Sequence, residues 1–314
     1  MLSVVVNFHN NRREAKNTLY SLTRAYQRDA QDIAYEVIAI DHGSSDPLSE
    51  EEVRAFGPEF RCRYVRTTAV SPVGAINAAC REASGEQLLV MIDGAHIVSP
   101  GVFRLATEAF RLFPSPFIAT VPFHLGPKHQ SDSVMEGYNQ KVEDELLRGS
   151  GWKENGYRLY LLAGQFADAS EGWFGALFES GCFGIRKVDY VALGGFEERF
   201  QSRGGGLVNL DFFQTALSRR ELQYTVLFGE GTFHQFHGGV ASNAPRSRSP
   251  WDEFHEEYLR IRGKEFARVP RRPFLFGAMP EEAVHVAKVS AARAFELWQA
   301  NPDVGMNDQK LCWR

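Results

Sequence analysis

The segments SVVVNFH (residues 3–9) and YEVIAIDHGSSD (residues 35–46) decide the expected fold, because both are apolar runs that end in polar side chains. Between them, Leu19, Leu22 and Tyr26 recur at the spacing of an α-helix. A strand, a helix and a second strand in this order form a βαβ unit, whose two strands are parallel. The N-terminal part of the chain is therefore expected to contain a parallel sheet.

The alternation of strand and helix continues to about residue 125. Its most apolar strand, EQLLVMIDGA (residues 86–95), has the composition of a strand that is buried on both faces of a sheet. We predict an α/β fold with a Rossmann-like, mostly parallel sheet flanked by helices. Ligands bind such sheets at the carboxyl ends of the strands, so the loops at Asn7, Asp41 and Asp93 are expected to converge on one crevice.

The second half of the chain combines an irregular segment with a glycine-rich loop. Regular alternation stops at about residues 126–175, and strands return at ALFESGCFGIRK (residues 176–187) and QYTVLFGEGTF (residues 223–233). The loop SRGGGLVNLDFF (residues 202–213) lies between these strands. Beyond residue 245, a mostly helical extension is expected either to wrap the core or to mediate self-association as a homo-oligomer.

The composition argues against several classes of protein. With 44% hydrophobic and 24% charged residues, the 314-residue chain has the balance of a globular protein rather than of a disordered one. Its net charge of −4 argues against a protein that binds nucleic-acid phosphates independently of sequence. A G-x-G-x-x-G after the first strand and a P-loop are both missing, which argues against a nicotinamide dehydrogenase and a P-loop enzyme.

The expected cellular location also follows from composition. No window approaches the roughly 18 consecutive apolar residues that a bilayer span needs, and no secretory signal precedes the first strand. The four cysteines, Cys62, Cys80, Cys182 and Cys312, lie far apart, as expected for reduced thiols. We therefore expect a cytoplasmic protein without a transmembrane segment.

Asp41 closes the second strand of the predicted sheet. A carboxylate at this position can accept hydrogen bonds from a nucleobase or a ribose. The alternative is a structural turn, with a helix N-cap at Ser44, Ser45 or Asp46. The sequence alone leaves both interpretations open.

Four further residues have the chemistry of metal ligands. Asp93 and His96 emerge together after a buried strand, and His234 and His237 follow another apolar strand. Carboxylate oxygens and imidazole nitrogens suit a divalent cation such as Mn²⁺ or Mg²⁺. The alternative for each histidine is a packed residue without a ligand role.

Four segments resemble the family 2 glycosyltransferases of the GT-A fold over roughly residues 1–245: VVVNFHN, VIAIDHGSSD, GAINAACREASGEQLLVMIDGAHIVSPG and SGCFGIRKVDYVALGGFEERF. The resemblance implies a nucleotide-sugar half (residues 1–100) and an acceptor half (residues 101–245), followed by the helical extension (residues 246–314). It also implies a hexosyltransferase of polysaccharide biosynthesis. Such an enzyme moves a sugar from a nucleotide-diphosphate donor, expected to be a UDP-sugar, to a glycan or other hydroxyl acceptor.

The resemblance also assigns roles to single residues. It implies that Asn7, His9 and Asp41 hold the nucleoside and that Asn77 lies near the donor. It places Asp93 in the family's D-x-D motif, which binds a metal ion on the diphosphate.

The chain departs from this pattern at the second carboxylate of the D-x-D motif, because it reads DGAH from Asp93 to His96. Related GT-A enzymes use Asp-x-His with a further downstream histidine. The resemblance therefore implies Asp93, His96 and His234 as metal ligands, with His237 as a reserve ligand.

A second departure concerns the catalytic base. Many relatives follow the glycine-rich loop with Glu-Asp-x-Asp, whereas this chain has an amide, Asn209, at the usual position of the base. Glycosyl transfer needs a base that takes the proton of the acceptor hydroxyl. We predict that Asp211 is this base; the alternative is a structural acid in the first turn of a helix.

The sequence therefore predicts a metal-dependent, inverting glycosyltransferase. Its main alternative is a non-catalytic GT-A-like module that binds a nucleotide sugar or a glycan, since carboxylates are missing from both motifs. A nucleotidyltransferase is a third interpretation. NFHNNRREAK (residues 7–16), which follows the first strand, lacks the glycines typical of that class.

Overall fold

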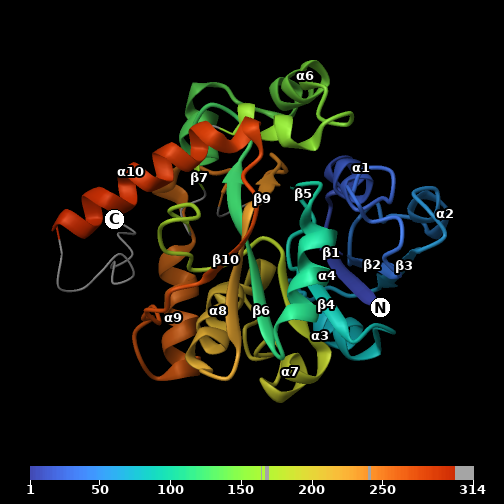
Figure 1. Cartoon of the computed structure of the whole chain (residues 1–314). Coiled ribbons are helices and arrows are strands. Elements are labelled where there is room, and N and C mark those ends of the chain that lie inside the picture. Colours follow the sequence, from blue (N-terminus) through green and yellow to red (C-terminus); the bar gives the residue numbers. More distant parts are fainter. Residues whose placement is uncertain (164, 167–169, 240–241, 301–314) are drawn as a thin grey trace.

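The computed structural model describes residues 1–163, 165–166, 170–239 and 242–300. In these residues ten strands form one sheet in the order β10-β9-β6-β8-β4-β1-β2-β3, with β5 paired to β9 and β7 paired to β6 (Figure 1). The strands are β1 (Leu2–Phe8), β2 (Tyr35–His42), β3 (Phe60–Val65), β4 (Gln87–Met91), β5 (His96–Val98), β6 (Pro116–His124), β7 (Gln165–Phe166), β8 (Phe183–Arg186), β9 (Gln223–His234) and β10 (Phe274–Gly277).

Helices cover both faces of the sheet. Side chains of β1 alternate between the faces: Val4 and Val6 pack with α1 and α4, whereas Val5 packs with α3 and α8. Both faces are therefore apolar, which explains the unbroken apolar runs of the sequence. The helices are α1 (Arg12–Ser21), α2 (Glu50–Arg54), α3 (Val73–Glu82), α4 (Val102–Leu112), α5 (Gln130–Ser133), α6 (Gln140–Ser150), α7 (Lys187–Ala192), α8 (Val208–Ser218), α9 (Trp251–Arg262) and α10 (Val284–Ala300).

Strand directions confirm the predicted α/β fold. β1 runs parallel to β2 and to β4, and β6 runs parallel to β9. β8 lies between β4 and β6 and is antiparallel to both, so the sheet is mixed but mostly parallel. The carboxyl ends of β1, β2 and β4 lie at the same edge, because their registers pair Phe8 with Asp41 and Val6 with Met91.

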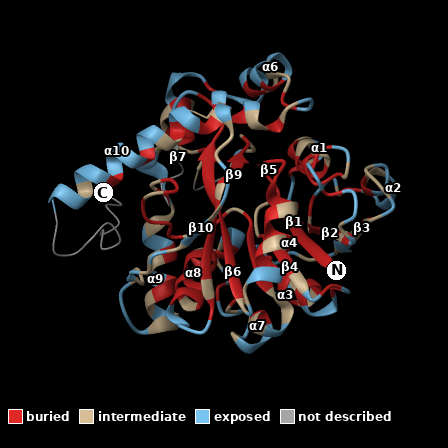
Figure 2. Cartoon of the chain, in the orientation of Figure 1, coloured by how far each residue is buried: buried red, intermediate tan, exposed pale blue. Residues whose placement is uncertain are grey.

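The C-terminal extension packs on the core. Phe254 and Tyr258 of α9 belong to the same apolar cluster as Val5. The extension also supplies β10, a strand that the sequence analysis did not predict, which runs parallel to β9. Figure 2 shows that much of α10 is exposed, and self-association through this extension stays a prediction.

A side-chain ion pair joins the extension to α8. Arg262, at the end of α9, donates to Asp211 Oδ1 at 2.7 Å and to Asp211 Oδ2 at 2.5 Å. Asp211 is only 5% exposed, so Arg262 supplies the compensating charge that a buried carboxylate needs. This bidentate contact helps to hold the extension against the sheet domain.

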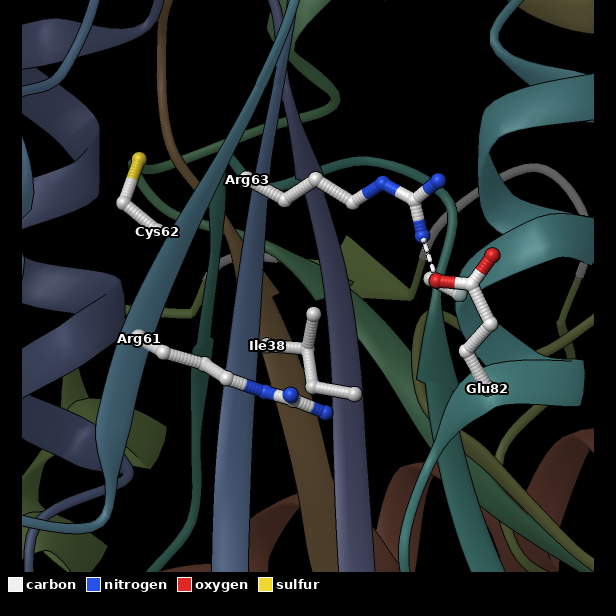
Figure 3. A pocket seen from close by; sticks show the side chains of 6 residues that line it. Ile38, Arg61, Cys62, Arg63 and Glu82 are labelled. Atoms are coloured by element: carbon white, nitrogen blue, oxygen red, sulfur yellow. Dashed lines mark hydrogen bonds and ion pairs between the residues drawn. The ribbon is translucent and has the colours of Figure 1, made fainter.

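A hollow between β3 and α3 lies apart from the predicted site residues. A hollow of about 220 Å³ between β3 and α3 is lined by Arg61 and Arg63, which are paired with Glu36 and Glu82 (Figure 3). The hollow contains none of the predicted site residues.

Across the described residues, no helix combines the length and the apolar character of a membrane span. The cysteines that the structure describes are free thiols, as expected, and Cys312 lies outside the described residues.

The ion pair between α8 and α9 gives a stability prediction. Arg262→Ala leaves the buried carboxylate of Asp211 without its partner and is expected to lower the free energy of unfolding by about 2–4 kcal/mol. Urea unfolding followed by circular dichroism measures this change. Arg260→Ala, at an exposed position of the same helix, is the control. Equal stability of the two variants would contradict the assigned role of the pair.

Candidate metal and nucleotide site

Three histidines form a row across neighbouring strands at the end of β9. His96 of β5 pairs with His234 of β9, and His234 also pairs with His124 of β6. Residues paired in this way place their side chains on the same face of a sheet. The ring centroids lie 4.9 Å apart for His96 and His234 and 5.4 Å apart for His124 and His234. Three segments that are far apart in the sequence therefore contribute to one imidazole cluster.

Asp93 faces this cluster from the loop after β4. Its Oδ1 accepts a hydrogen bond from the Ala95 backbone N–H at 2.9 Å, which leaves Oδ2 toward the histidines. The distances from Oδ2 are 3.3 Å to His234 Nε2 and 3.6 Å to His237 Nε2. These three ligand atoms lie within 4.8 Å of one another. One carboxylate oxygen and two imidazole nitrogens this close together fit a divalent cation.

His96 has a different place from the one the resemblance implied. Its Nδ1 lies 3.1 Å from the backbone carbonyl oxygen of Asp93. Since a carbonyl oxygen can only accept, Nδ1 carries the proton, and the lone pair is on Nε2, which lies against Gly181 rather than toward Asp93. The structure therefore puts His237, the reserve ligand, beside Asp93 and His234. His96 instead donates a hydrogen bond to the backbone of the Asp93 loop.

Burial and charge keep these groups in the forms that bind metal. Burial lowers the pKa of His234 to about 4, so the imidazole is neutral at neutral pH. Burial alone would raise the pKa of Asp93, but the adjacent imidazoles of His237, His234 and His96 hold it well below its usual range. The site therefore presents an ionised carboxylate beside the neutral imidazole of His234.

Two amide side chains orient the histidines, and the sequence analysis did not identify either. Gln130 Oε1 accepts from His234 Nδ1 at 2.6 Å, and Gln130 Nε2 donates to the His234 carbonyl oxygen at 2.9 Å. This pair leaves His234 Nε2 without a proton and directed at Asp93. Asn243 Oδ1 accepts from the backbone N–H groups of His237, Gly238 and Gly239. Gln130 lies 104 positions before His234, so no local sequence motif marks it, whereas Asn243 follows His237 by six residues.

The predicted nucleotide residues at the end of β1 lie beside the Asp93 loop. Asn7 is 5% exposed and donates through Nδ2 to the Ile92 carbonyl oxygen at 3.2 Å. Its Oδ1 is buried and has no hydrogen-bond partner among the described residues. His9 is exposed, and its Nδ1 donates to the His42 carbonyl oxygen at 2.7 Å. Asn7 therefore has an acceptor to spare at the carboxyl edge of the sheet.

Asp41 makes the hydrogen bonds of a turn. Its Oδ1 accepts from the Ser44 N–H at 3.2 Å, and its Oδ2 accepts from the Leu48 N–H at 2.9 Å. The residue is 1% exposed. The structure thus shows that Asp41 orders the loop after β2, which was one of the two open interpretations.

Asn77 is engaged within the protein, contrary to its expected place near the donor. Its Nδ2 donates to the Phe196 carbonyl oxygen and to Glu198, and its Oδ1 accepts from the Tyr190 hydroxyl and the Phe196 N–H. The amide has no capacity left for a ligand. Asn77 instead fastens α3 to the segment after α7.

A carboxylate that the sequence analysis missed lies near the metal ligands. Glu179, on the loop before β8, is half-buried, and its Oε2 accepts from Asn209 Nδ2 at 2.7 Å. Burial raises the pKa of Glu179, and the nearby charge of Asp93 raises it further. Asn209 therefore orients a carboxylate other than Asp211. Asp211, by contrast, is held by Arg262.

Comparisons with known proteins agree with this fold. Residues 3–131 match the sequence model of the family described as glycosyl transferase family 2. No curated protein matches the chain. Among solved structures, TarS of S. aureus superposes with a TM-score of 0.52 at 18% identity, over 83% of this chain and 38% of that one. A structure of S. aureus TarS 1-349 in complex with UDP-GlcNAc gives a TM-score of 0.50 at 16% identity, over 95% of this chain and 72% of that one.

The likeness has a limited extent. This chain spans 38% of the length of the TarS structure that superposes with the TM-score of 0.52. At identities of 16–18% such a likeness concerns the fold alone. The predicted fold, with a mostly parallel sheet between helical layers, is confirmed on this basis.

The hydrogen bonds of Asp41 give a prediction that separates its two interpretations. Asp41→Ala removes the acceptor of two buried N–H groups and is expected to lower the free energy of unfolding by about 1–3 kcal/mol. Urea unfolding measures this loss, and calorimetry with UDP measures nucleotide affinity on the same sample. Asp46→Ala, at an exposed carboxylate of the same loop, is the control and should stay within about 0.5 kcal/mol. Weaker UDP binding at unchanged stability would instead favour direct contact with the nucleoside.

Proposed function

We propose that the chain transfers a sugar from a nucleotide-diphosphate donor to an acceptor hydroxyl, because residues 3–131 match the sequence model of glycosyl transferase family 2. The observation that carries this proposal is the convergence of Asp93, His234 and His237 at the carboxyl edge of the sheet. Donors bind α/β sheets at this edge. A UDP-sugar is the donor we favour, since the S. aureus TarS 1-349 structure was solved with UDP-GlcNAc. A glycan acceptor and a cytoplasmic location stay predictions.

The donor diphosphate would lie against the metal ligands. A divalent cation held by Asp93, His234 and His237 supplies positive charge that stabilises the diphosphate as it leaves. The spare acceptor of Asn7 faces the same edge and suits a ribose or nucleobase donor group. The loop that Asp41 orders forms the neighbouring wall, so its role toward the nucleoside is indirect in this proposal.

Glu179 is the carboxylate we favour as the catalytic base. An inverting transfer needs a base that receives the proton of the acceptor hydroxyl on the side opposite the diphosphate. Glu179 lies near Asp93, has a raised pKa and is oriented by Asn209. Asp211 remains the base predicted from the sequence, but Arg262 engages both of its oxygens. This ion pair turns both oxygens toward the guanidinium of α9, so it weighs against Asp211 as the base.

Removal of the metal tests the proposed function against a non-catalytic binding module. Release of UDP from UDP-sugars is expected to stop after treatment with EDTA and to return with Mn²⁺, because the diphosphate needs a positive charge to leave. Asp93→Asn should lose the activity even with Mn²⁺. His255→Ala, a histidine on the surface of α9, should behave as the unchanged protein. Full activity in chelator would rule out the metal, and no activity with any nucleotide sugar would favour the binding module.

Paired amide substitutions test the assignment of the base. Glu179→Gln keeps the shape of the side chain but cannot receive a proton, so UDP release is expected to fall by about a hundredfold to ten-thousandfold. Affinity for UDP and for the metal should stay unchanged. Asp211→Asn is the matched variant and is expected to keep near-normal turnover at a temperature where it is fully folded. If Asp211→Asn lowers the rate of UDP release more than Glu179→Gln does, Asp211 rather than Glu179 is the base.

A further inference from the structure

The donor set of the metal site is rich in nitrogen. The position that would supply a second carboxylate in an Asp-x-Asp motif holds Ala95, and two imidazoles stand in its place. Mg²⁺ prefers oxygen ligands and keeps several waters, whereas imidazole suits the borderline ions Zn²⁺, Co²⁺ and Ni²⁺. The exchange of oxygen for nitrogen therefore changes which cations bind well.

The nitrogen donors are also held in place by the protein itself. Gln130 fixes the tautomer of His234, and Asn243 Oδ1 accepts a hydrogen bond from the His237 backbone N–H. Between the two histidines, the Phe236 N–H donates to both oxygens of Glu143, at 3.0 and 2.8 Å. The Phe236 carbonyl oxygen accepts from Arg13 at 2.9 Å. The His234–His237 segment is thus bonded at each residue without help from a nucleotide.

Neighbouring side chains limit how far the ligands can rearrange. His124 and His96 flank His234 on the adjacent strands, and all three are buried. Gly181 lies against this row, because an added Cβ would come within 2.4 Å of Thr232 Oγ1 and 2.9 Å of His96 Cδ2. A packed wall of this kind holds His234 Nε2 in a fixed direction, as a preorganised ligand requires.

We propose that Asp93, His234 and His237 select a borderline divalent transition ion, such as Co²⁺ or Zn²⁺, over Mg²⁺ and bind it before any nucleotide arrives. The inference rests on the proposed function and narrows the choice of metal within it. Mn²⁺, the weakest binder of the transition series, takes an intermediate place between these ions and Mg²⁺.

Cobalt provides a direct readout of this preference. Full-length protein freed of metal by chelator and desalting is titrated with Co²⁺, while visible absorption and calorimetry follow binding. We expect one equivalent of Co²⁺ to bind without nucleotide and to give ligand-field bands. A large excess of Mg²⁺ should leave these bands in place, and Zn²⁺ should remove them. Loss of the bands at comparable Mg²⁺ concentrations would overturn the inference.

Two variants test the physical origin of the preference. His237→Asp replaces a nitrogen with an oxygen, so the ratio of Co²⁺ to Mg²⁺ affinity should fall. Gln130→Leu frees the tautomer of His234 and should weaken Co²⁺ binding by about 10–100-fold. Circular dichroism melting shows whether this second variant folds. His255→Ala is the control, with unchanged bands and affinity.

The outcomes separate this inference from the proposed function. An unchanged affinity ratio in His237→Asp overturns the selectivity, while EDTA-sensitive UDP release would still support a metal-dependent transferase. If the unchanged protein binds no divalent ion even with UDP present, both the proposed ion selectivity and the metal dependence of the proposed function are wrong.

Discussion

The register of β9 against β6 is the constraint on which the site depends. The two strands pair Ala119 with Val226, and after an irregularity the pairing resumes with Val121 opposite Gly231. This shifted register puts His234 beside His124, and the antiparallel β5 then adds His96 on the other side. Because side chains alternate between the faces of a sheet, a slip of one residue would turn His234 away from Asp93. The ligand cluster is thus a consequence of strand pairing.

Burial of so many imidazoles in one place would be unfavourable if they carried charge. Burial lowers the pKa of His96, and it lowers the pKa of His124 well below the ordinary value, so the row is neutral at neutral pH. Neutral rings can pack edge to face as aromatic groups do. The ionised Asp93 then has the imidazoles of His96, His234 and His237 around one carboxylate oxygen, an arrangement that a cation completes. Packing and ligand chemistry are therefore compatible in the same cluster.

The two departures from the family pattern are linked to compensating features elsewhere in the chain. Where the second carboxylate of the D-x-D motif is missing, His237 arrives from the segment after β9. Where an amide replaces the usual base, Asn209 donates to Glu179 from the loop before β8. In both cases the candidate replacement comes from a different segment of the chain. A motif examined along the sequence shows only the loss, whereas the tertiary structure also shows which group lies in the vacated region.

The sequence by itself determined the class of fold and the edge of the sheet at which Asn7, Asp41 and Asp93 lie, because apolar runs and polar strand ends are local patterns. It also marked Asp93 and His234 as candidate metal ligands, a role that stays a prediction. The preference for His237 over His96 came only from the tertiary structure, since it depends on which ring nitrogens lie close to Asp93 and His234. The same holds for Asn77, Asp211 and Glu179, whose hydrogen-bond partners lie far along the chain. Long-range partners decide whether a polar side chain is free for chemistry, and no local pattern encodes them.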